Sequence, residues 1–227
     1  MQSPPPLARI SLVKDIVLVG GGHTHALVLR RWAMRPLPGA RLTLINPGPT
    51  APYSGMLPGH VAGHYDREEL DIDLVRLARF AGARLILGRA TGLDPEARVV
   101  TVADRRIAYD IASLDIGITA EMPALPGFAT HAVPAKPLDT YAARWRDFLG
   151  RAAAGRAAPQ VAVIGGGIAG IELAMAMAHA LRQAGLAPEV TLIEAGDGLA
   201  VPGARARARL ERALRGNGVT VRTGAAA

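Results

Sequence analysis

The chain has 227 residues, of which 50% are hydrophobic, and its mean hydropathy is +0.21. This apolar content is enough for one or two domains with real cores, and it excludes an intrinsically disordered protein. The formal net charge of +7 comes from 26 basic and 19 acidic residues, with arginine dense in 205–212. Such a run can bind nucleic acid or anionic lipid, but we interpret it as the solvated face of an amphipathic helix and expect no nucleic-acid partner.

Other features of the sequence limit its chemistry and location. The chain contains no cysteine, so we expect neither disulfide reduction nor cysteine-dependent sulfide oxidation within it. No apolar run reaches the roughly 20 residues of a membrane span. Residues 1–10 lack the charged start and apolar segment of a signal peptide. We therefore expect a cytoplasmic protein without a transmembrane helix.

The first half of the chain predicts a parallel sheet that carries an inserted β-meander. Alternation, helical periodicity and Gly or Pro breaks define the elements. In chain order we expect a strand at 15–19, a helix at 24–34, a strand at 41–46, a loop at 47–63, a helix at 67–80, a strand at 84–87, meander strands at 99–102 and 107–109, and a strand at 110–117.

The second half predicts a second unit of the same kind. After an extended proline-containing connection at 123–137, we expect a helix at 138–154, a strand at 160–164, a helix at 168–183, a strand at 189–194, a helix at 204–215 and a strand from 218. The fold class is therefore α/β, with two Rossmann-like, doubly wound, three-layer domains. We expect an FAD-binding domain at 1–135, a connecting helix and linker at 136–159 and an NAD(P)H-binding domain at 160–227. The last domain is expected to be incomplete, because a doubly wound domain needs more strands.

A glycine-rich turn lies between strand and helix in the second unit. It has all three fingerprint glycines, Gly165, Gly167 and Gly170. A strand, a turn without Cβ atoms and a helix N-terminus bring backbone N–H groups and a positive dipole end to a pyrophosphate. Glu194 ends the next strand, where an acid accepts hydrogen bonds from the adenosine ribose and repels a 2′-phosphate, so NADH is favoured over NADPH. The alternative is a purely structural glycine turn.

A less regular turn of the same design lies in the first unit. Gly20 and Gly22 are present, but His25 occupies the third glycine position and Asn46 replaces the ribose acid. Asparagine can still hydrogen-bond a hydroxyl, although without the help of a charge. Two such turns predict two dinucleotides, and a protein that holds two dinucleotides usually moves a hydride between them. The pair of turns thus favours a flavin and nicotinamide oxidoreductase.

The order of these motifs resembles the FAD-dependent pyridine nucleotide-disulfide oxidoreductase superfamily. The resemblance rests on Gly20-Gly21-Gly22, the meander, the strand Tyr109–Gly117 and the second glycine turn with Glu172-Leu173-Ala174. The segment Pro52–Pro58 and the run Gly-Gly-Gly-His-Thr-His are most similar to the type II NADH dehydrogenase-like branch. Within that branch, the chain resembles flavoproteins fused to or associated with selenophosphate synthetase (selenide, water dikinase). The resemblance as a whole implies an FAD-dependent NAD(P)H dehydrogenase that passes a hydride from NADH to FAD and on to a small-molecule acceptor such as a quinone.

The resemblance also implies roles for individual residues. The implied FAD contacts are Gly20, Gly22, His23, Thr24, Asn46, Ser54, Gly55, Ala90 and Gly117. The implied NAD(P)H contacts are Gly165, Gly167, Gly170 and Glu194. Glu172 is the catalytic candidate, near the meeting point of flavin and nicotinamide, or else it caps the first turn of its helix. The family's late Gly-Asp motif and its C-terminal dimerisation or membrane-contact region would lie beyond Ala227. Peripheral contact with the inner membrane would involve that region.

Histidines near the first turn raise the question of a metal site. His60 and His64 are four residues apart, which would place them on one helical face. Gly59 and Gly63 argue against a helix there, and no cysteine or paired acid is near in sequence. We therefore expect no metal, and we place His23 and His25 at the helix start, near the phosphates or the flavin.

Two other functions stay open from the sequence. One is a non-catalytic nucleotide-binding or regulatory module associated with selenophosphate synthetase, which Asn46 and His25 favour. The other is a single-cofactor NAD-dependent dehydrogenase, which requires the first glycine turn to be empty.

Overall fold

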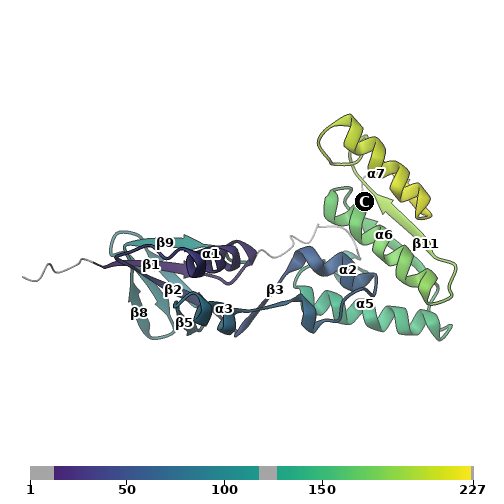
Figure 1. The fold of residues 1–227 in the computed structure, drawn as a ribbon. Coiled ribbons are helices and arrows are strands. Elements are labelled where there is room, and N and C mark those ends of the chain that lie inside the picture. Colours follow the sequence, from purple (N-terminus) through teal and green to yellow (C-terminus); the bar gives the residue numbers. More distant parts are fainter. Residues whose placement is uncertain (1–12, 118–126, 226–227) are drawn as a thin grey trace, which may run out of the picture. The chain divides into compact units, whose positions relative to one another are not determined.

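The structure, a computed structural model, describes residues 13–117 and 127–225 (Figure 1). The expectations for residues 1–10 and for the start of the 123–137 connection lie outside the described residues. The chain divides into two compact units. Of the described residues, 13–52 and 71–117 form unit 1, and 53–70 and 127–225 form unit 2. These units differ from the continuous boundaries predicted from the sequence, because Tyr53–Leu70 packs within unit 2.

Unit 1 is a three-layer structure around a parallel sheet with the strand order β5-β2-β1-β9. The elements of the sheet and its connecting helices are β1 (Lys14–Val19), α1 (His23–Met34), β2 (Ala40–Asn46), α3 (Leu74–Phe80), β5 (Arg84–Leu87) and β9 (Ile111–Leu114). A second, antiparallel layer contains β6 (Ala90–Asp94), β7 (Val99–Val102) and β8 (Arg105–Ala108). The short pair β3 (Thr50–Pro52) and β4 (Asp71–Asp73) is also antiparallel.

Alternation along β1 fills the two cores of unit 1. Leu18 points to the side of the sheet where Leu29 of α1 and Leu74 of α3 are fully buried. Val17 and Val19 point to the opposite side, where they pack with residues of the meander such as Val100. Successive residues of a strand face opposite sides of a sheet, so a short apolar run supplies both cores. The parallel sheet and the meander predicted from the sequence are confirmed.

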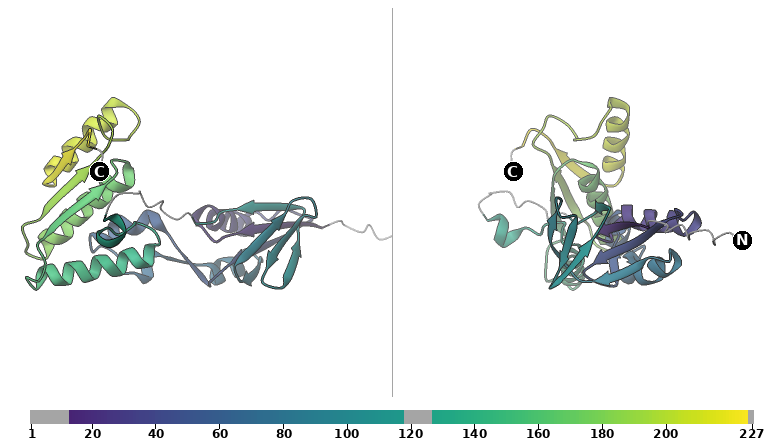
Figure 2. Two further views of the ribbon diagram at one scale, coloured as in Figure 1. Left: turned by 180° about the vertical axis from the view of Figure 1, so that it is seen from behind. Right: turned by 90° about the vertical axis from the view of Figure 1, so that its left-hand side faces the viewer.

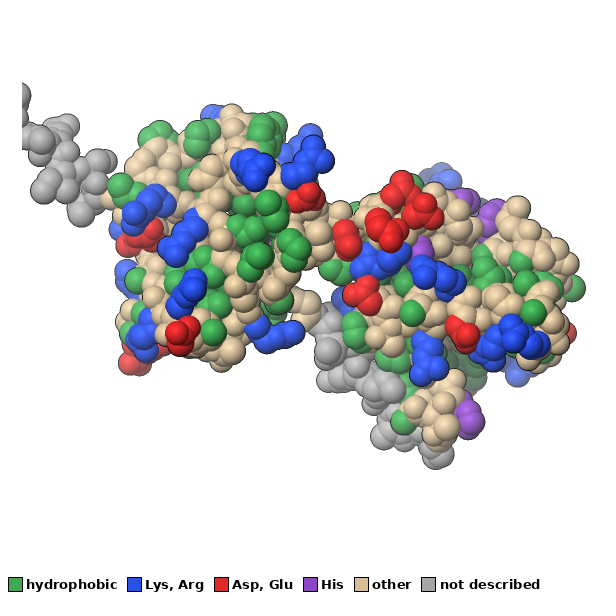
Figure 3. Space-filling view, turned by 90° about the horizontal axis from the view of Figure 1, so that it is seen from below, with side chains coloured by type: hydrophobic (Ala, Val, Ile, Leu, Met, Phe, Trp, Pro, Cys, Tyr) green, Lys and Arg blue, Asp and Glu red, His purple; other side chains and the backbone are tan. Residues whose placement is uncertain are grey.

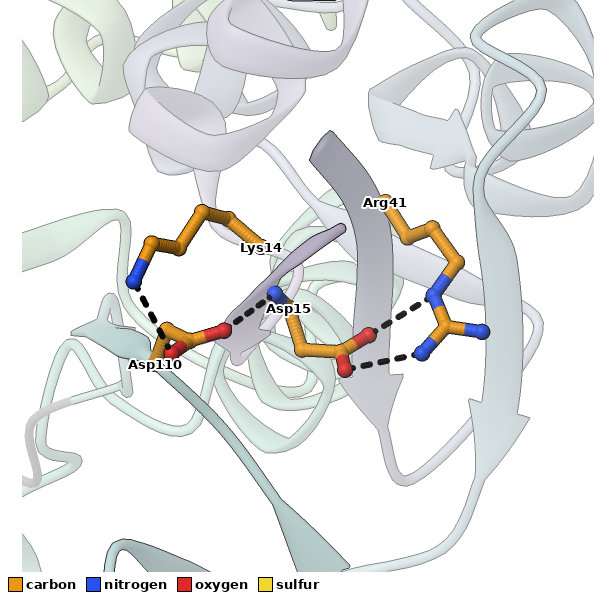
Figure 4. Close-up of polar contacts among 4 residues, drawn as sticks. All are labelled: Lys14, Asp15, Arg41 and Asp110. Carbon is orange, nitrogen blue, oxygen red and sulfur yellow. Dashed lines mark hydrogen bonds and ion pairs between the residues drawn. The ribbon is translucent and has the colours of Figure 1, made fainter. Parts of the chain in front are cut away.

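The edge of the sheet at which β1 begins is held by side-chain contacts on the surface (Figure 4). Arg41 donates to both carboxylate oxygens of Asp15, at 3.0 and 2.8 Å. Asp110 accepts from the backbone N–H of Asp15 at 2.8 Å and pairs with the Lys14 ammonium at 3.3 Å. The backbone hydrogen bond is the main reason that the pKa of Asp110 is lowered, with Lys14 contributing. Because the ion pairs are exposed, each adds little to stability.

Unit 2 contains a three-stranded parallel sheet in the order β10-β11-β12 (Figure 2). Its strands are β10 (Gln160–Ile164), β11 (Glu189–Ile193) and β12 (Val219–Arg222). Its helical segments are η1 (Ser54–Met56), α2 (Leu57–Val61), η2 (Glu68–Leu70), α4 (Phe128–His131), α5 (Leu138–Ala153), α6 (Ile168–Gln183) and α7 (Ala204–Gly216). Helix α6 is central, since Ile171 and Leu181 are fully buried together with Leu192 of β11 and Leu214 of α7.

Three sequence predictions about local structure were wrong. The predicted loop 47–63 contains α2 despite Gly59, because Leu57 and Val61 are buried among the side chains of α5 and α6. The Trp145 indole also donates to the Val61 carbonyl at 3.0 Å. The predicted helix 67–80 is a short 3-10 turn, then β4, then α3, which Asp73 caps by accepting from the Arg76 N–H. The connection 123–137 contains the short helix α4 rather than only extended chain.

Charge is spread over the surface of the described residues. On the face drawn in Figure 3, lysine and arginine side chains lie scattered among hydrophobic and acidic ones instead of forming one patch. Arg205, Arg207, Arg209 and Arg212 are exposed on α7, as the amphipathic pattern predicted, while Leu214 of the same helix is buried. Among the described residues, none of the helices combines the length and hydropathy that crossing a bilayer requires.

Candidate dinucleotide-binding sites

The glycine turn of unit 2 has the geometry of a tight strand-to-helix connection. Gly165 has a φ of +106°, a region that favours glycine, and its N–H donates to the Ile193 carbonyl at 2.8 Å. A Cβ on Gly170 would lie 2.0 Å from the carbonyl oxygen of Gly165. Only glycine at position 170 lets α6 approach the end of β10 this closely. Helix α6 begins directly after Gly167, and its first N–H groups have no partner within the helix.

Glu194, directly after β11, is hydrogen-bonded to this turn. Its carboxylate accepts from the N–H of Gly166 at 2.6 Å and from the N–H of Gly196 at 2.9 Å. These backbone bonds, the one from Gly196 first, lower the pKa of Glu194. A carboxylate has about four acceptor positions. Glu194 therefore fixes the turn and still has capacity to accept from two ribose hydroxyls.

The turn of unit 1 repeats this arrangement residue for residue. Gly20 has a φ of +93° and donates to the Ile45 carbonyl at 2.8 Å, as Gly165 does to Ile193. The N–H of Gly21 donates to Asn46 Oδ1 at 2.8 Å, as that of Gly166 does to Glu194. The two turns are therefore structurally equivalent, with Asn46 in the position of Glu194.

Asn46 is buried and nearly saturated with hydrogen bonds. Its amide nitrogen donates to the carbonyls of Gly48 at 2.8 Å and Thr50 at 3.2 Å, which uses both of its N–H groups. Its oxygen accepts from Gly21 and has one lone pair left. Asn46 can therefore accept one further hydrogen bond but has no N–H to donate to a ligand.

His25 takes the third glycine position of the first turn in an unexpected way. The side chain is only 1% exposed. Nδ1 lies 2.7 Å from the carbonyl oxygen of Gly20, and Nε2 lies 2.9 Å from the Ser113 hydroxyl on β9. Because a carbonyl can only accept, the ring proton is on Nδ1, which donates a hydrogen bond to the Gly20 carbonyl. The sequence predicted that His25 lies near the helix start, and its ring in fact links the turn to β9.

Asp115, which follows β9, also contacts the first turn, and sequence reasoning missed it. Its carboxylate accepts from the N–H of His25 at 3.0 Å. A Cβ on Gly22 would lie 2.5 Å from that carboxylate, and a Cβ on Gly20 would lie 2.1 Å from the backbone oxygen of Asp115. The glycines at 20 and 22 therefore make room for the end of β9. The sequence offered one signal for this contact, since Asp115 lies only two residues before Gly117, which was already predicted to contact FAD.

The other predicted site residues lie at several places in the two units. His23 and Thr24 are the first two residues of α1 and are exposed, while Ala90 begins β6 and Gly117 follows β9 in unit 1. Ser54 and Gly55 lie in η1 of unit 2.

Glu172, the catalytic candidate, is exposed on α6. It is the fifth residue of the helix, and the first turn contains no acid, so the alternative of a capping carboxylate is wrong. Within the described chain, Glu172 makes no hydrogen bond or ion pair. Its role near a nicotinamide stays a prediction.

The histidines do not form a metal cluster in the part of the chain that the structure describes. No three His, Asp or Glu side chains there converge as metal ligands would. His60 Nδ1 lies 2.9 Å from the Tyr65 carbonyl oxygen, and because a carbonyl can only accept, Nδ1 is the donor. His64 lies beside His179 of α6, with ring centroids 5.3 Å apart.

The residues present fit two pyrophosphate groups. Each turn has a glycine with positive φ, a helix that begins three residues after it, and close contacts that an added Cβ would prevent. Backbone N–H groups and the positive end of a helix dipole are what a pyrophosphate requires. In both units the turn lies at the carboxyl ends of parallel strands, the usual ligand-binding edge of such a sheet.

Comparison with known families shows to which family a chain with these two glycine turns belongs. Residues 14–227 match the family model described as pyridine nucleotide-disulphide oxidoreductase. Among curated proteins, no sequence gives a significant match.

Solved structures share the fold. The sulfide:quinone oxidoreductase from Aquifex aeolicus has a TM-score of 0.75 at 21% identity, over 93% of this chain and 51% of its own. NDH2 from Plasmodium falciparum in complex with NADH has a TM-score of 0.73 at 17% identity, over 92% of this chain and 48% of its own. The water-forming NADH oxidase from Lactobacillus brevis bound to NADH has a TM-score of 0.69 at 22% identity, over 93% of this chain and 46% of its own. The chain thus spans about half the length of these proteins.

Proposed function

Because the chain belongs to the pyridine nucleotide-disulphide oxidoreductase family, we propose that it holds FAD at the turn of unit 1 and NAD(P)H at the turn of unit 2. The observation that carries this proposal is the equivalence of the two turns. Each has the positive-φ glycine, the backbone bond to the next strand of its βαβ unit and the side chain that accepts from the middle glycine. FAD, when bound, supplies the electron acceptor for a hydride, and the protein supplies position and electrostatics.

Glu194 supports NADH as the preferred donor. Its pKa is lowered by the N–H groups of Gly196 and Gly166, so it is a carboxylate at neutral pH. A carboxylate there accepts from ribose hydroxyls and repels the 2′-phosphate of NADPH. The turn that this carboxylate stabilises is also the turn that receives the pyrophosphate, so one residue serves both the fold and the choice of donor.

The acceptor for electrons from the flavin is proposed to be a quinone or another small molecule. This part of the proposal rests on the resemblance to type II NADH dehydrogenase-like proteins. The resemblance to flavoproteins associated with selenophosphate synthetase adds a synthetase domain as a proposed partner, and a selenium compound then becomes a candidate acceptor.

A second candidate function is a nucleotide-binding module without turnover. The unit 1 turn supports it, because Asn46 has no N–H left to donate and the buried His25, at the third glycine position, is bonded to the Gly20 carbonyl. Such a module would bind nucleotides and leave the redox state of any bound flavin unchanged when NADH is added.

One experiment separates these functions. The full-length protein is purified, its bound nucleotide is released by heat and identified, and NADH or NADPH is titrated anaerobically in parallel samples. We expect released FAD, loss of the flavin's visible absorption with NADH, and a much weaker response to NADPH. In Glu194→Gln, which keeps the shape of the side chain, we expect the preference for NADH to fall. Protein that contains FAD but keeps its absorption with either donor would favour the module, and protein that contains no flavin would contradict the proposal.

A further inference from the structure

A carboxylate of the protein itself lies at the helix terminus where the first pyrophosphate is proposed to bind. Helix α1 begins at His23, and His25 is its third residue. The N–H of His25 is one of the first-turn groups that lack a partner within the helix, and Asp115 Oδ2 accepts from it at 3.0 Å. The helix dipole at this end attracts negative charge. Asp115 therefore occupies part of an anion-binding position.

The two turns differ in where their acid is placed. In unit 2 the acid is Glu194, which contacts the middle glycine, and the third residue of α6 is Gly170. In unit 1 the residue that contacts the middle glycine is the neutral Asn46, and the acid lies instead at the third residue of the helix. In the second turn, no described carboxylate accepts from the Gly170 N–H. The two turns thus have equivalent backbones, but the acidic side chain contacts the middle glycine in unit 2 and the third residue of the helix in unit 1.

We propose that Asp115 is a positioning residue that sets the affinity of the first turn for FAD. The inference rests on the proposed function, because it assumes a pyrophosphate at this helix terminus. Two effects of Asp115 oppose each other. Its hydrogen bond to the His25 N–H and the close packing of Gly20 and Gly22 on it hold the turn in shape. Its charge repels the phosphates and offsets part of the positive potential at the N-terminus of α1.

Substitution of Asp115 can separate these two effects. Asp115→Asn removes the charge while its amide oxygen can still accept from the His25 N–H. Asp115→Ala removes both the charge and the hydrogen bond. We expect Asn at this position to tighten FAD binding, and Ala to lower the thermal stability of the protein because the helix loses a cap.

Asp110 provides a matched control on the same segment of chain. It lies five residues earlier, at the other end of β9, where it accepts from the Asp15 N–H and pairs with Lys14 (Figure 4). Asp110→Asn changes the net charge by the same amount and also keeps an acceptor. Five residues of extended chain span about 16 Å, which exceeds the Debye length of about 8 Å at physiological salt.

The test measures FAD affinity in the full-length protein freed of nucleotide, by the quenching of flavin fluorescence, for wild type and the three variants. Thermal unfolding without FAD checks that each variant is folded. We expect Asp115→Asn to bind FAD about tenfold more tightly at physiological ionic strength, with a smaller gain at high salt, and Asp110→Asn to match wild type.

The outcomes separate this inference from the proposed function. Unchanged or weaker binding by Asp115→Asn, while wild type binds FAD, overturns the inference and leaves the function standing. An equal gain in Asp110→Asn also overturns it, since the effect would then be one of net charge. Binding by Asp115→Asn but not by wild type supports the inference and contradicts FAD as the wild-type cofactor. Absence of binding in every folded protein overturns both.

Discussion

The close approach of α6 to β10 makes a quantitative prediction about two glycines of one turn. In Gly170→Ala the new Cβ would lie 2.0 Å from the Gly165 oxygen, more than 1 Å inside the van der Waals contact that starts near 3.4 Å. The neighbour is backbone, so the helix must move away from the strand. Overpacking of this kind costs about 1–3 kcal/mol, and the better helix propensity of alanine returns up to about 1 kcal/mol. We expect a net loss of about 1–2 kcal/mol.

Gly167→Ala is the matched control. Position 167 has an ordinary φ of −75°, and a Cβ there would have nothing within 4 Å. Its stability should stay within about 0.5 kcal/mol of wild type. The methyl group would nevertheless stand where the backbone must approach a pyrophosphate, so NADH affinity should fall. We therefore expect Gly170→Ala to lose both stability and NADH affinity, and Gly167→Ala to lose NADH affinity alone.

Urea unfolding followed by circular dichroism, together with NADH titration at saturating flavin, measures both quantities. Because m-values in urea are about 1–3 kcal/mol/M, a loss of 1 kcal/mol lowers the urea midpoint by about 0.3–1 M, which is easily resolved. A Gly170→Ala protein as stable as wild type would refute the reasoning about close approach. A Gly167→Ala protein with unchanged NADH affinity would refute the assignment of the turn to the pyrophosphate.

Three further predictions concern single side chains. His25→Ala removes a buried side chain and its hydrogen bonds to Gly20 and Ser113, so it should lower the free energy of unfolding in urea by about 2–4 kcal/mol. Ser113→Ala should lower it by only about 1 kcal/mol. Equally small losses in both variants would contradict the role of His25 in linking the turn to β9. The folded-state pKa of Glu194 lies below its ordinary value of 4.5, so its stabilisation is present above that pH and is lost as pH falls through the lowered pKa. The stability advantage of wild type over Glu194→Gln should therefore shrink in urea unfolding below about pH 4.5, and a constant difference would speak against the hydrogen bonds. Trp145→Phe loses the bond to the Val61 carbonyl and should cost about 1–2 kcal/mol by thermal unfolding, while a neutral result would deny that this bond holds α2.

Local periodicity explains which parts of the structure could be predicted. The strands that end at Val19 and Ile164 alternate or are continuously apolar, and each runs into glycines that only a turn explains. Asn46 and Glu194 end the next strand of their units, so the topology alone brings them to the turns. These features depend on residues that are near in sequence or on the regular path of a βαβ unit.

The contacts that could not be predicted join residues far apart in the chain. His25 meets Ser113 across 88 residues and Asp115 across 90, and neither pair has a sequence signature. Helix α2 forms around Gly59 because α5 and α6 bury its apolar residues, which outweighs the low helix propensity of glycine. The predicted helix from 67 was wrong because Asp73 caps a later start and the residues before it pair as a strand.

We propose that this chain holds two dinucleotides and that electrons pass from the nucleotide at the second turn to the one at the first. Anaerobic addition of NADH to FAD-loaded full-length protein tests it most directly when wild type is compared with Gly167→Ala. We expect one equivalent of NADH per flavin to abolish the visible flavin absorption of wild type, while the variant still holds FAD but needs far more NADH. Reduction of both proteins at the same NADH concentration, or a wild-type flavin that NADH leaves oxidised, would contradict it.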